Sequence, residues 1–67
     1  MSVAKVIEIT ATSARSFEDA IGSGIKRAGK TVQDVRGAWV KSMKVEVSDG
    51  KITQYRVVLK VTFVLTD

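Results

Sequence analysis

Trp39 is the residue of this 67-residue chain whose type points most directly to a chemical role. It is the only tryptophan, and it lies in a stretch, 37–48, whose composition is typical of a β-strand. An indole on a strand can anchor a core or a subunit interface, or it can offer a flat surface on which an aromatic ligand stacks. The residues alone leave both interpretations open.

Catalytic groups are scarce. The chain has no cysteine and no histidine, so it lacks a thiol nucleophile, the usual general base at neutral pH and the commonest zinc ligand. No glycine-rich loop between a strand and a helix could cradle a phosphate. The carboxylates show no spacing typical of a metal site or an acid–base pair: Glu8, Glu18, Asp19, Asp34, Glu46, Asp49 and Asp67. We therefore expect a protein that is not an enzyme.

The charge balance is compatible with an ordinary solvated, mildly basic surface or with an anionic ligand. Eleven lysines and arginines face seven acids, which gives a net charge of +4, and a phosphate or a nucleotide would suit such a surface. The basic residues are scattered, and one tryptophan without further clustered aromatics gives little support for nucleic-acid binding. Because no stretch could cross a bilayer and the N-terminus has no apolar signal segment, we expect a cytoplasmic protein with no membrane partner.

The last predicted strand, 54–65, has two different faces. Successive side chains of a strand point to opposite sides. One side is wholly apolar and consists of Tyr55, Val57, Leu59, Val61, Phe63 and Leu65. The other side is mixed and consists of Gln54, Arg56, Val58, Lys60, Thr62 and Val64. The only helical pattern, 17–32, can cover the apolar side, so the mixed side is left without a cover.

The remaining elements follow from local signals. Residues 3–10 predict a strand, and residues 11–15 predict a loop. Ser16 is the expected N-cap of the helix, and Asp19 completes a variant of the capping box. Within the strand 37–48 the apolar side switches near Met43 or Lys44, which indicates a bulge or a bend. The pair Asp49-Gly50 predicts a tight hairpin turn into the last strand.

These signals predict one α+β domain, 1–67, in the order strand–helix–strand–strand. A chain of this size buries only about 60% of the surface that its unfolded form exposes. Small folds usually add disulfides, a metal or a partner subunit. The chain has no cysteine, which excludes disulfides, and no histidine, which removes the commonest zinc ligand. We therefore expect self-association.

The whole chain resembles the dodecins. The segments that carry the resemblance are VAKVIEITATSARSFEDAIGSGIKRAGKTV and QYRVVLKVTFVL. The resemblance implies a curved three-stranded antiparallel sheet wrapped around one helix, and a hollow homododecamer that stores or sequesters a flavin (FMN or riboflavin). In the family, paired flavins lie at subunit contacts between tryptophans of symmetry-related chains.

The chain departs from this family at two positions of the flavin site. The family's stacking tryptophan aligns with Gly37, and Trp39 lies two residues further along, on the same side of the strand but roughly 6–7 Å away. The glutamine that bonds the flavin's polar edge is replaced by Arg56, which only donates, and Gln54 on the same side can partly compensate. The expected cofactor-binding residues are therefore Trp39, Arg56, Gly37 and Gln54. The alternative is a shell that binds no flavin and holds a metal ion or another anion.

Overall fold

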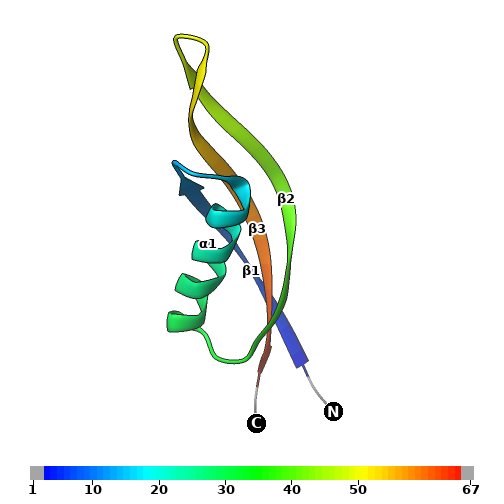
Figure 1. Ribbon diagram of the computed structural model, residues 1–67. Helices are drawn as coiled ribbons and strands as arrows, with labels where there is room; N and C mark the ends of the chain where they lie inside the picture. Colours follow the sequence, from blue (N-terminus) through cyan, green and yellow to red (C-terminus); the bar gives the residue numbers. More distant parts are fainter. Residues whose placement is uncertain (1–2, 66–67) are drawn as a thin grey trace.

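The fold has one helix and three strands in the predicted order. A computed structural model describes residues 3–65, in which β1, α1, β2 and β3 follow one another (Figure 1). Their bounds are Val3–Ser13, Phe17–Thr31, Val35–Ser48 and Lys51–Leu65. The predicted α+β class is confirmed. No helix among residues 3–65 is long and apolar enough to cross a membrane.

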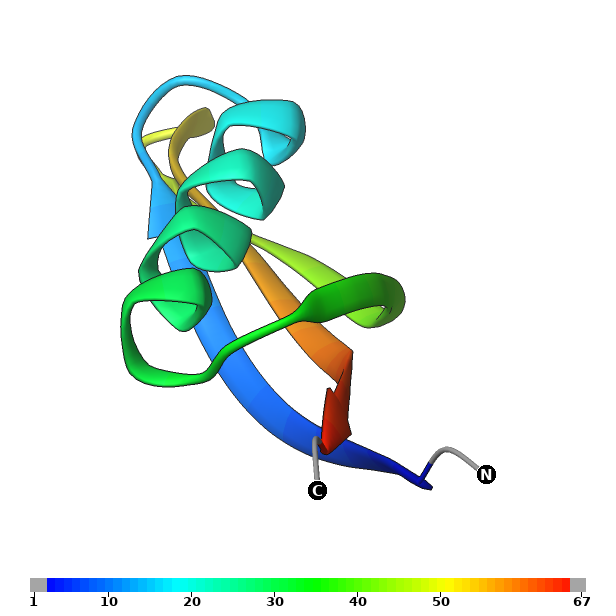
Figure 2. The same cartoon turned by 90° about the horizontal axis from the view of Figure 1, so that it is seen from below.

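The three strands form one antiparallel sheet with β3 in the centre, in the order β1-β3-β2. The central strand is also the most apolar one, as expected for a strand that has a neighbour on each side. The sheet is curved and twisted, and α1 lies along one of its faces (Figures 1 and 2). The helix packs mainly against β1 and β3 and least against β2.

The core lies between α1 and the apolar side of β3. Val57, Leu59 and Val61 are fully buried, and Phe63 is nearly so. The prediction that this side of β3 is covered is therefore confirmed over its middle. It is wrong at the end of the strand, where Leu65 is 46% exposed because the helix does not reach it.

Gly24 lets the helix approach the sheet closely. A Cβ atom at this position would lie 3.0 Å from the Ala11 Cβ atom and 3.2 Å from the Leu59 Cδ1 atom. At Gly22, two residues earlier, an added Cβ atom would have nothing within 4 Å. Close packing therefore accounts for Gly24, and nothing in the structure accounts for Gly22.

The predicted loop 11–15 is wrong over its first three residues. Ala11, Thr12 and Ser13 continue β1 and pair with residues 57 to 55 of β3. Likewise β2 begins at Val35 and β3 at Lys51, earlier than predicted. In each case pairing with a neighbouring strand extends the element beyond its local sequence signal.

The helix start follows one half of the predicted capping box. The Ser16 hydroxyl accepts a hydrogen bond from the Asp19 backbone N–H at 2.9 Å, so Ser16 is the N-cap. The Asp19 carboxylate does not return to the Ser16 N–H. It accepts from the hydroxyl of Ser13 at 2.7 Å, because the longer β1 brings Ser13 to the helix start.

The β2–β3 hairpin closes through the predicted turn. Asp49 and Gly50 both have positive φ angles, 51° and 74°, which is the conformation that a two-residue hairpin turn favours. Register shifts interrupt the ladder between Val40 and Ser42 and again between Glu46 and Val47. These bulges confirm the expected change of side within β2.

Candidate functional site

The side of the sheet that faces away from α1, here called the outer face, carries all four predicted site residues. On β3 this face is made by Gln54, Arg56, Val58, Lys60 and Thr62, whose neighbours in sequence form the core. Residues paired directly across a ladder project to the same side. Gly37 pairs with Thr62, and Trp39 pairs with Lys60. Gln54 and Arg56 therefore share a face with Gly37 and Trp39, while their role in binding stays a prediction.

Trp39 lies beside a small cluster of charges. The residue is 53% exposed, and its partner Lys60 pairs in turn with Glu8 of β1. The Glu8 carboxylate lies 3.2 Å from the ammonium groups of both Lys41 and Lys60. The hydrogen bond from Lys41, and then that from Lys60, lowers the pKa of the Glu8 carboxyl. One acid thus holds two lysines next to an open indole.

Gly37 leaves an open space on the same face. A Cβ atom built at this position would meet nothing within 4 Å. The backbone next to Trp39 is therefore uncovered on the outer face. A ring that stacked on Trp39 could extend over Gly37 without a clash inside this subunit.

Arg56 occupies the other end of the outer face. Its Nη2 atom lies 3.4 Å from a carboxylate oxygen of Glu46, while its Nε atom is shielded from solvent and has no hydrogen-bond partner among residues 3–65. Arg56 pairs with Lys44 on one side and with Thr12 on the other. Two like charges directly opposite each other are unfavourable in a sheet. The Glu46 carboxylate offsets part of this repulsion, and an anion held by Arg56, Lys44 and the Thr12 hydroxyl would offset the rest.

The two ends of the outer face are separated by four residues of β3. This spacing corresponds to roughly 13 Å along a strand. The row between them contains Val58 with its partners Thr10 and Ser42. The face therefore suits a flat ring at Trp39 joined by a flexible chain to an anionic group at Arg56.

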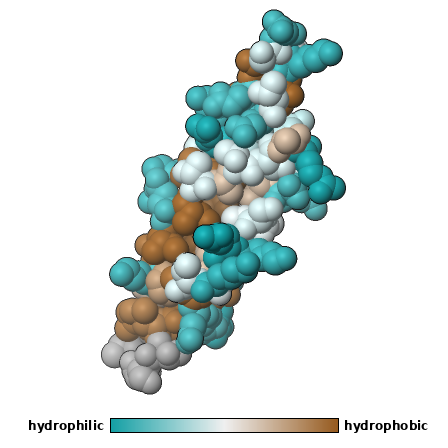
Figure 3. Space-filling model, turned by 90° about the vertical axis from the view of Figure 1, so that its left-hand side faces the viewer, coloured by the Kyte–Doolittle hydropathy of each residue, from teal (hydrophilic) through white to brown (hydrophobic). Residues whose placement is uncertain are grey.

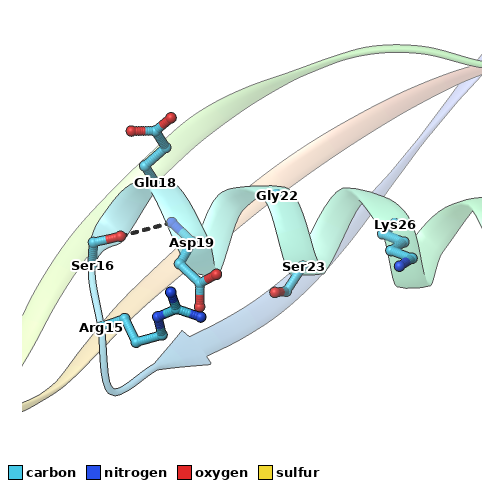
Figure 4. Close-up of a pocket in the computed structure, with 7 residues that line it drawn as sticks. All are labelled: Arg15, Ser16, Glu18, Asp19, Gly22, Ser23 and Lys26. Atoms are coloured by element: carbon cyan, nitrogen blue, oxygen red, sulfur yellow. Dashed lines mark hydrogen bonds between the residues drawn. The ribbon is translucent and has the colours of Figure 1, made fainter.

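A cavity at the start of the helix was missed by sequence reasoning. It has a volume of about 460 Å³ and carries charges of both signs, contributed by Arg15, Glu18, Asp19 and Lys26 (Figure 4). Adjacent acids at the start of a helix are typical of helix capping, so their sequence gave no signal of a cavity. Among residues 3–65, no three acidic side chains come together in a way that could hold a metal ion.

Comparisons with known proteins agree with this fold. The family model described as Dodecin matches residues 3–66. The calcium dodecin of Mycobacterium tuberculosis is 47% identical over 64 residues, which cover 94% of this chain and 89% of that protein.

Solved structures give the same result. The dodecin of Streptomyces davaonensis has a TM-score of 0.93 at 30% identity. The match covers 98% of this chain and 97% of that chain. A single-residue mutant of T. thermophilus dodecin has a TM-score of 0.94 at 31% identity, with complete coverage of both chains. The crystal structure of the M. tuberculosis calcium dodecin, described as having a novel calcium-binding site, has a TM-score of 0.82 at 41% identity. The match covers 97% of this chain and 93% of that chain.

Proposed function

This chain belongs to the dodecin family, whose members are small binding and storage proteins, and we propose that it is a homododecamer that stores or sequesters a flavin without turning it over. The flavin would lie on the outer face, at contacts between subunits. Trp39 would supply the stacking surface. Arg56 would supply the polar contact, with Gln54 beside it and Gly37 leaving room for the ring.

One observation carries the proposal for the ligand. A half-exposed indole shares one sheet face with Arg56, whose Nε atom has no partner among the described residues, and with Lys44 opposite it. Stacking on an indole buries the flat isoalloxazine surface, and a guanidinium binds phosphate well. This arrangement favours FMN over riboflavin, because only FMN carries a phosphate on its side chain.

Self-association is supported by what the single subunit leaves uncovered. The fully buried core is confined to a few side chains around Leu59. Both β1 and β2 are long edge strands, and neither contains a proline, a residue that often protects sheet edges. Exposed apolar side chains lie along all three strands, among them Val6, Val40 and Ile52. A closed assembly of identical subunits would cover such surfaces.

A calcium site is the second candidate. It is favoured by the 47% identity to a protein named calcium dodecin and by the solved structure of that protein with a calcium-binding site. The described residues of one subunit offer no cluster of three acidic ligands. A calcium site would therefore combine carboxylates of several subunits, or carboxylates with backbone carbonyls and water, which calcium accepts.

Fluorescence and calorimetric titrations test both candidates. FMN and riboflavin are added to the purified protein, and quenching of the flavin emission is followed to saturation. Calcium is added separately, after treatment with a chelator, and its binding is measured as heat. Quenching with about one FMN per subunit supports the flavin proposal. Calcium binding without quenching would make the second candidate correct, and the absence of both would refute the two together.

Size measurement completes the test. Light scattering of the unliganded protein should give the mass of twelve chains. A smaller mass would contradict the dodecamer even if a flavin binds.

A further inference from the structure

The tip of the β2–β3 hairpin is a two-stranded arm that the rest of the subunit does not cover. The ladder between β1 and β3 ends at the pair Ser13–Tyr55, so residues 46–54, here called the arm, pair only with each other. Figure 1 shows the arm projecting past α1. A two-stranded ribbon is marginally stable in water by itself. The arm is therefore expected to pack against a partner.

One side of the arm is apolar. Val47 and Ile52 are direct partners across the ladder, and the two residues are 59% and 51% exposed. A bulge precedes them, where the Thr53 hydroxyl donates to the Glu46 carbonyl oxygen at 3.2 Å. Because bulges bend and twist a ladder, the arm is turned relative to the sheet behind it.

A second apolar surface, half-buried within the subunit, lies between β1 and α1. It is a groove of about 330 Å³. The apolar floor comes from β1 and includes Ile7, Ile9 and Ala11. The rim comes from the second half of α1 and includes Ser23, Arg27 and Thr31. The hydropathy surface of this side shows an apolar area over the lower half of the subunit and a smaller one near the arm (Figure 3).

We propose that the arm of one subunit lies in the groove of a second copy, with Val47 and Ile52 against the floor. This inference rests on the proposed homo-oligomer and names the contact that builds it. The arm extends past the start of α1, whereas the groove borders its second half, so an arm cannot reach its own groove. The contact therefore joins unlike surfaces of two copies, and such contacts form a closed assembly when their rotation closes.

Charge supports a second copy as the occupant. The arm carries two acids and one lysine, Glu46, Asp49 and Lys51, so it is negative in a chain whose net charge is positive. Of the three cations in the helix segment 23–31, Arg27 lines the groove, whereas Lys26 and Lys30 do not, and no acid is among the lining residues. An acidic arm beside a basic rim is electrostatically complementary.

The test changes each surface separately. Val47→Thr with Ile52→Thr keeps the β-branched shape and the strand propensity of the arm while it removes apolar surface. Ser23→Phe places a ring on the exposed rim of the groove. Each variant should lose the full-size assembly and run as smaller species in light scattering, with an unchanged circular dichroism spectrum.

Matched controls distinguish these sites from any other loss or gain of apolar surface. Val3→Thr with Leu65→Thr changes another exposed pair of ladder partners, at the opposite end of the sheet. Lys30→Phe adds a ring to α1 outside the groove lining. Both controls should keep the wild-type mass. If they dissociate as far as the test variants, or if the test variants keep the wild-type mass, the arm–groove contact is wrong.

Mixing gives a second, independent readout. The arm variant retains an intact groove, and the groove variant retains an intact arm. An equimolar mixture should therefore form a larger species than either variant alone, and no gain in mass would refute the proposed contact. If the wild type itself is a monomer, the proposed dodecamer fails and this contact fails with it, whereas a wild-type dodecamer with insensitive variants removes only the contact.

Discussion

Trp39 lies directly opposite Lys60 across the β2–β3 ladder, on the outer face of the sheet. The Lys60 ammonium is held at 3.2 Å by Glu8, which also binds Lys41 at 3.2 Å. Both lysines next to the indole are therefore partly neutralised.

The Arg56 end of the same face also has two cations and one acid, because Lys44 lies opposite Arg56 and Glu46 lies 3.4 Å from the Arg56 Nη2 atom. The two ends differ in their other groups: one offers the Trp39 ring, and the other offers an Arg56 Nε atom that has no hydrogen-bond partner among the described residues. This difference favours a ligand with its ring at Trp39 and its negative charge at Arg56.

Replacing Trp39 tests the stacking role. Trp39→Ala should weaken FMN binding and restore the fluorescence of the bound flavin. A base-sized ring stacked on an aromatic side chain contributes about 1–3 kcal/mol, which corresponds to roughly 5- to 150-fold in affinity. Met43→Ala removes an exposed apolar side chain from the opposite side of β2 and should leave the titration unchanged. If quenching survives in Trp39→Ala, Trp39 is only a structural anchor.

The Arg56 end should decide between FMN and riboflavin. Arg56→Gln removes the guanidinium at the position where the family commonly has glutamine. Hydrogen bonds to charged groups contribute about 1.5–3 kcal/mol, and the partial exposure of Arg56 reduces this, so we expect about a tenfold loss of FMN affinity. Riboflavin, which has no phosphate, should bind as before or more tightly. Lys30→Gln, which removes the same charge from α1, is the control, and an equal loss there would point to net charge alone.

The outer face should also be buried between subunits. Val58 lies in its middle, between Thr10 and Ser42, and is only partly covered within one subunit. Val58→Asp would place a carboxylate in that contact, and a buried unpaired charge costs several kcal/mol. Light scattering should show a dissociated protein, whereas Val58→Thr should remain assembled. An intact assembly with Asp at this position would place the outer face in solvent.

The alternation in β3 made most of the fold predictable. Val57, Leu59 and Val61 are the residues that alternation assigns to one side, and they are the fully buried ones. The end of β1 was not predictable in this way, because Ala11 and Ser13 give no strand signal and are held in the strand by their pairing with β3. The Ser13–Asp19 hydrogen bond depends on that extension and was missed with it.

The candidate site was predictable in its face but not in its contacts. Counting alternate residues correctly put Gln54 with Arg56 and Gly37 with Trp39. Joining these two pairs on one face required the register between β2 and β3, which the bulges shift. The ion pairs of Glu8 with Lys41 and of Glu46 with Arg56 connect different strands. No spacing within one segment could reveal them.

The two helix glycines should respond in opposite ways to alanine. At Gly22 an added Cβ meets nothing, so Gly22→Ala should raise the free energy of unfolding by about 0.5–1 kcal/mol through the loss of unfolded-state entropy. At Gly24 the same methyl group meets the Ala11 Cβ atom at 3.0 Å, and that atom moves only with the strand. Overpacking costs about 1–3 kcal/mol, so Gly24→Ala should lower stability. If urea denaturation gives equal changes in the free energy of unfolding for the two variants, this explanation is wrong.

Glu8 should make stability depend on acid pH. Lys41 and then Lys60 lower the pKa of its carboxyl, so the folded protein binds a proton there less readily than the unfolded chain. The stabilisation is therefore present above the ordinary glutamate pKa of about 4.3 and is lost as the pH falls through the lowered folded pKa. Glu8→Gln should lower the melting temperature at pH 7, and it should reduce the drop in melting temperature between pH 5 and pH 3. Both effects should be smaller at high salt. The direct measurement is an NMR titration of the Glu8 carboxyl. Its pKa should return toward the ordinary value in Lys41→Met, and an unchanged value in that variant would mean that the Lys41–Glu8 pair does not form in solution.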